Sequence, residues 1–173
     1  MQEFGQQFSI WTIRLAVLLW IGFAVLWIRR DRISNARMKL MWAWGLATLL
    51  LVIHVISAFA YFHDWSHQLA AEHTAKVTDQ VVGWYWSGGI WFNYLFVLLC
   101  GVEAYLWTGR RHPLLRSKSA NRLVYGITVF MMINAAIVFA FTGFRWVALA
   151  GLGLVCVEMF RQRRSEKAAV DES

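Results

Sequence analysis

Histidine is concentrated in one segment of this 173-residue chain. Three of its five histidines, His63, His67 and His73, lie within eleven residues, and Asp64 lies among them. Imidazole together with carboxylate suits Zn, Cu or Fe, and a neutral imidazole can also ligate a haem iron. The segment therefore predicts a transition-metal or haem site with His63, His67, Asp64 and His73 as candidate ligands.

The spacing of the histidines limits how such a site could form. His63 and His67 are four residues apart, so on one helix they would share a face. His73 follows His67 by six residues, which places it about 120° further round a helix and roughly 9 Å along it. A three-histidine site therefore requires an interruption of the helix near residues 64–66. The alternative is that these histidines are interfacial residues that hydrogen-bond lipid headgroups, the loop backbone or a partner subunit.

The same loop, residues 63–85, has the pattern of a short amphipathic helix. Ser66 or Asp64 can cap its start, and Gly83 can end it after residue 82. Its apolar stripe is expected at positions four residues apart: Leu69, His73, Val77 and Val81. We expect this helix to lie on a membrane surface or over a helix bundle.

The elements that position these residues are expected to be membrane-spanning helices. The chain is 59% hydrophobic and 16% charged, against about 45–50% and about 25% in soluble domains. A run of about 20 apolar residues spans the hydrocarbon core of a bilayer. The sequence predicts an all-α polytopic membrane bundle over residues 1–160, with a charged cytoplasmic tail over 161–173. Its five expected spans cover 8–28, 40–62, 86–107, 123–142 and 146–160, of which the fifth is short.

Basic residues give the expected orientation. The net charge is +7, and fourteen of the seventeen Lys and Arg lie in the segments 29–39, 110–122 and 161–167. Positive charge concentrates in cytoplasmic loops, so we expect the N-terminus outside and the C-terminus in the cytoplasm of a cell inner (plasma) membrane. The bilayer, and no nucleic acid, is then the expected partner of the basic segments. Rings near span ends fit interfacial belts: Trp11, Tyr61, Trp84, Trp107 and Trp146.

Four polar side chains are expected at similar depth in four different spans. Arg14 lies roughly 9 Å and His54 roughly 12 Å from the outer ends of their spans, and Asn93 and Asn134 are placed alike. A lipid-facing Arg costs about 2.5–3.5 kcal/mol, so these groups should face inward. The layer is either a hydrogen-bonded core that fixes helix register or a cofactor-binding pocket. In the second case Arg14 would suit a quinone head, a haem propionate or a lipid phosphate.

Two carboxyl groups, Glu103 and Glu158, lie near the inner ends of their expected spans. We expect each to snorkel to the inner interface or to pair with its basic side chains. A proton path through Glu103 is the alternative.

Two classes of function fit these features. The first is a small integral membrane accessory subunit of a larger complex, associated with other membrane subunits or with copies of itself. The second is a redox or metal-binding membrane protein that uses the outer histidines for metal or haem and the polar layer for a quinone. An oligomeric channel or transporter is a third alternative. The sequence has no hydrolase triad, phosphate loop or HExxH motif, so we favour the accessory subunit, and no reaction follows from the motifs.

Overall fold

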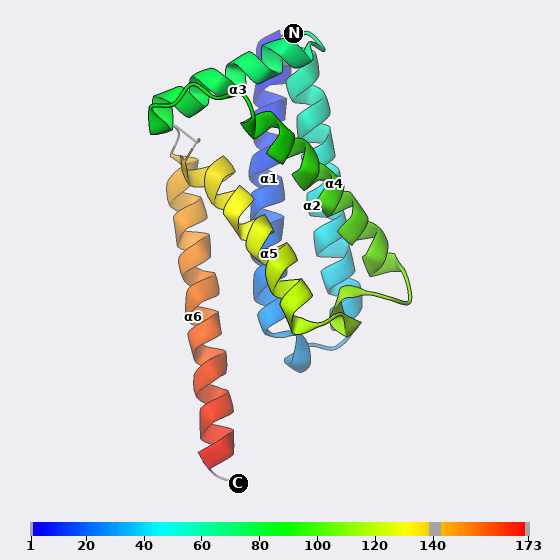
Figure 1. Cartoon of the computed structure of the whole chain (residues 1–173). Coiled ribbons are helices and arrows are strands. Elements are labelled where there is room, and N and C mark those ends of the chain that lie inside the picture. The colour runs from blue at the N-terminus through cyan, green and yellow to red at the C-terminus, as the bar shows by residue number, and fades with distance from the viewer. Residues whose placement is uncertain (1, 139–142, 172–173) are drawn as a thin grey trace.

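The protein is described by a computed structural model over residues 2–138 and 143–171 (Figure 1). These ranges are helical almost throughout, as the sequence predicted. Two short 3-10 turns, Arg30–Arg32 and Pro113–Leu115, lie in the connections, and a π-helical segment, Asn134–Val138, follows the fifth α-helix. The α-helices within the described ranges are α1 (Gln2–Ile28), α2 (Ala36–Phe62), α3 (His67–Val82), α4 (Gly89–Thr108), α5 (Lys118–Ile133) and α6 (Phe144–Asp171).

Among the described residues, three helices are long and apolar enough to cross a membrane, which supports the expectation of a membrane protein. They are Glu3–Ile28, Ala36–Phe62 and Gly89–Thr108, and they correspond to the first three expected spans. α1 and α2 lie side by side and run in opposite directions, joined by a short connection (Figure 1).

The last two expected segments take a different form. α5 ends at Ile133 and passes into the π-helical segment, while residues 139–142 of the expected span 123–142 lie outside the described residues. The expected span 146–160 is only the first part of α6, which begins at Phe144 and continues to Asp171. The expected tail is therefore helical as far as residue 171, and residues 172–173 lie outside the described ranges.

A cluster of aromatic side chains joins four of the helices. The ring of Phe23 on α1 lies 5.0 Å from Trp44 on α2, 6.0 Å from Trp107 on α4 and 5.4 Å from Tyr125 on α5, measured between centroids. Such aromatic pairs contribute about 0.5–1.5 kcal/mol each beyond their burial. Trp107 is fully buried. The expectation that Trp107 is an interfacial ring was therefore wrong, because α5 and α1 cover this end of α4.

α3 lies across the end of the bundle that holds the N-terminus (Figure 1). Its caps are those that the sequence predicted: the Ser66 hydroxyl accepts a hydrogen bond from the Leu69 backbone N–H, and Gly83 ends the helix with a left-handed φ of 71°. The expected apolar stripe is not the buried face, because Leu69 is exposed whereas Ala70 and Ala75 are buried. These small side chains allow α3 to pack closely against α4.

Candidate functional site

His54, a member of the expected polar layer, binds the backbone of α1. Its Nδ1–H donates to the carbonyl oxygen of Ser9 at 2.8 Å, with the tautomer assigned from this contact. In return the Ser9 hydroxyl donates to the carbonyl oxygen of His54 at 3.4 Å. Thr12 and Ser57 reinforce the contact from either side by donating to the same two carbonyl oxygens. This reciprocal arrangement fixes the register of α1 against α2, which is the structural alternative stated above for the polar layer.

Arg14 connects α1 with the beginning of α6. The carbon of its guanidinium group lies 5.0 Å from the ring centroid of Trp11 and 5.5 Å from that of Phe144. Cation–π contacts of this kind contribute about 0.5–1 kcal/mol where exposed and more where water is excluded. Arg14 therefore has aromatic neighbours on two helices.

The two asparagines of the expected layer lie apart from the contacts of His54 and Arg14 described above. Asn134 donates its side-chain amide to the carbonyl oxygen of Phe130, one turn earlier on the same helix, at 2.8 Å. Asn93 is exposed, and because α4 begins only at Gly89 it lies about 6 Å from the helix start. The structure thus gives the four residues of the expected layer separate surroundings, and neither cavity described below is lined by any of them.

The break that a three-histidine site would require is present. Asp64 and Trp65 both adopt left-handed backbone conformations, with φ of 45° and 59°, and they separate α2 from α3. The resulting reversal brings the rings of His63 and His73 to 5.3 Å between centroids. Residues that are ten apart in sequence are therefore neighbours, an arrangement that a continuous helix would prevent.

His67 takes a different partner from the other two histidines. Its Nδ1 lies 2.9 Å from the hydroxyl of Tyr94 on α4, and its ring lies 5.5 Å from that of Trp91. Within residues 2–138 and 143–171 no group of three or more His, Cys, Asp or Glu side chains is close enough to hold a metal ion. The structure therefore pairs His63 with His73 and uses His67 to attach α3 to α4.

A hollow of about 200 Å³ adjoins the His63–His73 pair and is also lined by Phe62, Leu69, Glu72 and Lys76. Burial lowers the pKa of His63 from its ordinary value of 6.5, the charge of nearby His73 lowers it further, and Asp64 opposes both effects. His63 is therefore held neutral in the folded protein at neutral pH.

Glu103 is the most deeply buried charged group among the described residues, with 1% of its surface exposed. Arg116, in the connection between α4 and α5, donates to both of its carboxylate oxygens at 2.7 and 2.9 Å. The Tyr125 hydroxyl adds a hydrogen bond at 3.2 Å, while Asn121 accepts from the same arginine at 2.7 Å. The expectation that Glu103 pairs with a basic side chain is confirmed, although sequence alone did not single out its partner.

Glu158 is paired in the same way at the far side of the bundle. Arg29, immediately after α1, donates to its two carboxylate oxygens at 2.9 and 2.6 Å, and Arg161 lies 3.3 Å away. This second bidentate pair connects the end of α1 to α6. The expectation of a basic partner for Glu158 is confirmed too.

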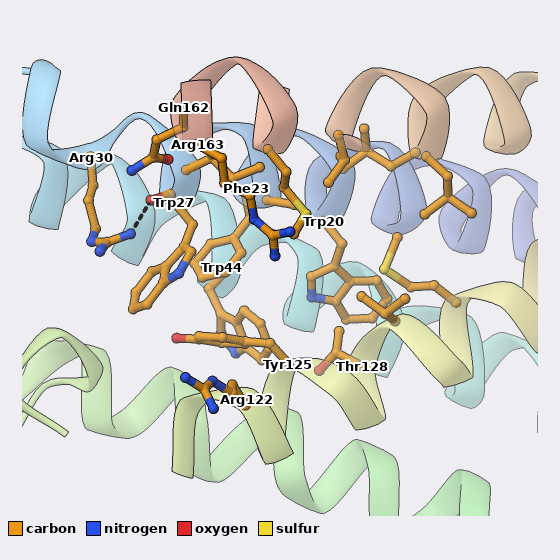
Figure 2. Close-up of a pocket in the computed structure, with 18 residues that line it drawn as sticks. Trp20, Phe23, Trp27, Arg30, Trp44, Arg122, Tyr125, Thr128, Gln162 and Arg163 are labelled. Carbon is orange, nitrogen blue, oxygen red and sulfur yellow. Dashed lines mark hydrogen bonds between the residues drawn. The ribbon is translucent and has the colours of Figure 1, made fainter. Parts of the chain in front are cut away.

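A larger cavity of about 550 Å³ lies between α1, α2, α5 and α6 (Figure 2). Its walls are mostly aromatic and aliphatic side chains, among them Trp20, Phe23, Trp27, Trp44 and Tyr125. The volume is typical of sites for small molecules and cofactors. Carboxylates, imidazoles and thiols are absent from the part of its lining that the structure describes.

Three arginines, Arg30, Arg122 and Arg163, also line this cavity, and they come from the α1–α2 connection, α5 and α6 (Figure 2). Sequence reasoning placed its ligand pocket elsewhere and missed this one. The available signal was the spacing of Trp20, Phe23 and Trp27, which repeats at three and four residues and puts three aromatic rings on one face of α1.

Comparison of the chain with protein-family models, curated proteins and solved structures gave no match. The function proposed below therefore rests on the residues and their geometry.

Glu103→Gln should lower the free energy of unfolding by up to about 3 kcal/mol, because it leaves the Arg116 guanidinium, which is 22% exposed, without its counter-charge. Reversible unfolding in mixed micelles measures this loss. Glu72→Gln is the matched control, since Glu72 forms an exposed ion pair with Lys76 on α3, and it should leave the unfolding free energy unchanged. Equal stability of the two variants would contradict the structural role of the Glu103 pair.

The junction between α2 and α3 should loosen in mild acid. Because the pKa of His63 is lower in the folded state than the ordinary 6.5, the unfolded state binds the proton more readily. The stability from neutral His63 is then complete above about pH 6.5 and decreases as the pH falls from there towards the lower folded-state pKa.

Hydrogen–deuterium exchange over residues 60–70, corrected for the intrinsic rate, should therefore accelerate between pH 7.5 and 5.5. His63→Gln should abolish this pH dependence, whereas His112→Gln, at the other end of the molecule, should preserve it. Exchange that is independent of pH in the wild-type protein would show that His63 does not control the junction.

Proposed function

We propose that this chain is a five-span integral protein of the cell inner (plasma) membrane that works as an accessory subunit and holds a membrane amphiphile in its aromatic cavity. The N-terminus lies outside and the C-terminus in the cytoplasm. The first part of α6 is the fifth span, and α5 with the residues after it is the fourth.

The positions of the basic segments support this orientation. The connection between α1 and α2, the connection between α4 and α5, and the far end of α6 all lie at one end of the molecule, and α3 lies at the other (Figure 1). These three places hold the basic segments. In a five-span arrangement two spans separate each basic segment from the next, which brings all three to the same side, and positive charge marks that side as cytoplasmic.

Cysteine accessibility tests the orientation. In intact cells an impermeant maleimide should label Gln68→Cys, an exposed position on α3, and should label Ser119→Cys on α5 only after the membrane is permeabilised. The wild-type chain, with Cys100 buried and Cys156 within α6, gives the background. Labelling of Ser119→Cys together with protection of Gln68→Cys in intact cells would reverse the orientation. Either result alone would refute the five-span arrangement.

The single observation that carries the binding role is the cavity between α1, α5 and α6. Its aromatic walls offer apolar surface inside the bundle, and its arginines lie at one end of it. An amphiphile has the matching form, with a hydrocarbon part for the walls and a polar head for the charged end. The two buried carboxylates near this end, Glu103 and Glu158, are already bound by arginines. A site lined by apolar side chains and arginines is suited to binding a ligand and not to proton transfer. This supports an accessory subunit over an enzyme.

Photolabelling with a lipid of neutral net charge tests chain uptake. The protein is placed in phosphatidylcholine nanodiscs that contain a phosphatidylcholine with a diazirine on its acyl chain, and the labelled peptides are mapped. We expect label on inward-facing residues of the cavity, such as Trp20 and Met132, besides label on the outer face of α4 at Leu95 and Leu98.

Ala24→Phe places a ring in the cavity lining and should remove the label from the cavity while that on α4 persists. Gly22→Phe is the matched control on the same helix, since open space surrounds the position of its Cβ; it should leave the cavity label intact. Absence of cavity label in the wild-type protein, or a cavity label that survives Ala24→Phe, would refute the binding role.

A further inference from the structure

We infer that the amphiphile is an anionic phospholipid of the arginine-side leaflet, with its phosphate bound by Arg122 and Arg163 and an acyl chain among the aromatic rings. This inference rests on the proposed function and adds the chemistry of the head. It concerns the end of the molecule opposite to the polar layer for which the sequence suggested a ligand.

The first support is the state of the two arginines. Arg122 on α5 and Arg163 on α6 line the cavity from different helices, and both are exposed. Throughout the part of the chain that the structure describes, neither forms a hydrogen bond or an ion pair with another side chain or the backbone. Their donors are thus available, and guanidinium groups match the geometry of phosphate oxygens through paired hydrogen bonds.

Arg30 also lines the cavity, but unlike Arg122 and Arg163 it has contacts within the fold. It donates to the carbonyl oxygen of Trp27 at 2.7 Å, and its guanidinium carbon lies 4.8 Å from the centroid of the same ring. Arg30 is held in place by these contacts, so it adds fixed positive charge beside a head bound by the other two arginines.

The second support is charge balance. The cavity lining holds three arginines, and among the described residues no carboxylate lines it. Glu158, the acidic residue of α6 nearest in sequence to Arg163 on its N-terminal side, is bound by Arg29 at 2.6 Å and by Arg161 at 3.3 Å. Arg30 has Asp31 as a counter-charge at 3.9 Å, whereas Arg122 and Arg163 have none among the described residues. Cations that face one apolar cavity repel each other, and an anion placed between Arg122 and Arg163 removes that repulsion.

The third support is depth. Arg30 follows α1 and Arg122 lies near the start of α5, so both belong to the end of the bundle where the basic connections gather, at the level expected for headgroups, and Arg163 lies towards the C-terminal end of α6. Trp20 lies two turns before the end of α1 and Met132 near the opposite end of α5, so the cavity extends towards the middle of the helices. A basic surface near a leaflet attracts anionic lipids by about 1 kcal/mol for each Lys or Arg. A phospholipid fits this order of groups better than a free anion, which would leave the aromatic part unused.

The test compares two photoreactive lipids that differ only in the head. Diazirine-bearing phosphatidylglycerol and phosphatidylcholine are added in trace amounts to separate phosphatidylcholine nanodiscs containing the full-length protein. We expect phosphatidylglycerol to label the cavity residues about tenfold more than phosphatidylcholine, because the choline cation of phosphatidylcholine offsets the charge of its phosphate and is repelled by the arginines, whereas phosphatidylglycerol keeps a net negative charge. Labelling on the outer face of α4 should be the same for both lipids.

The double variant Arg122→Gln/Arg163→Gln should remove the preference for phosphatidylglycerol, so that the two lipids label the cavity equally. Arg110→Gln/Arg111→Gln is the matched control, because both arginines are exposed and lie outside the cavity; it should retain the preference. Unfolding measured in parallel shows that both double variants are folded.

The outcomes separate the two proposals. Equal cavity labelling of the wild-type protein by both lipids, or a preference that survives Arg122→Gln/Arg163→Gln, overturns the assignment of an anionic lipid to these arginines while the binding role stands. Loss of cavity label by millimolar inorganic phosphate would mean that a free anion, and not a lipid, is the ligand, and this also overturns the inference. If neither lipid labels the cavity, the proposed function fails together with it.

Discussion

A carboxylate inside an apolar helix bundle requires a cation, and this requirement organises the arginine-rich end of the protein. Glu103 on α4 is almost completely buried and is held by Arg116 through two short hydrogen bonds. Glu158 on α6 is held in the same manner by Arg29. Removal of one partner from a buried pair leaves a charge that the interior cannot solvate. The first pair holds the connection between α4 and α5 against α4. The second holds the end of α1 against α6.

The two ion pairs also decide which arginines remain available. Arg29 and Arg116 neutralise buried carboxylates, and their direction is set by those contacts. Arg122 lies six residues after Arg116, on α5, and Arg163 lies on α6, and both line the cavity instead. The net charge of +7 thus contains cations of two kinds, those that neutralise buried carboxylates and those that line the cavity. We expect substitution of the second kind to preserve the fold.

Local signals were the most reliable part of the sequence. Ser66 and Gly83 set the ends of α3 because each acts on backbone groups within a few residues of itself. Runs of apolar residues located α1, α2 and α4 for the same reason, since the length of a span depends only on its own composition. The start of α1 and the end of α6 were predicted less accurately, because both helices continue beyond the apolar run: α1 begins at Gln2 and not at residue 8, and α6 continues to Asp171 and not to residue 160.

What could not be predicted is which side chains face one another. Depth along a span follows from residue number, but the direction around the helix depends on how neighbouring helices pack. Arg14, His54 and Asn134 were correctly placed within helices, and yet His54 faces the backbone of α1 while Arg14 faces aromatic rings. The approach of His63 to His73 depended on two left-handed residues, a backbone state that is uncommon outside glycine and asparagine.

These contrasts explain why the ligand site is assigned to the arginine end and not to the end with the histidines. At the end that holds α3, His54 is satisfied by α1 and His67 by Tyr94, so these polar groups bind the helices to one another. At the end that holds the basic connections, guanidinium groups line a cavity in which the described residues supply no carboxylate. Polar groups that are satisfied within the fold stabilise it, whereas charges left facing an apolar cavity need something from outside the chain. The imbalance of charge at one end, more than the presence of any single residue, is therefore the feature that indicates a ligand.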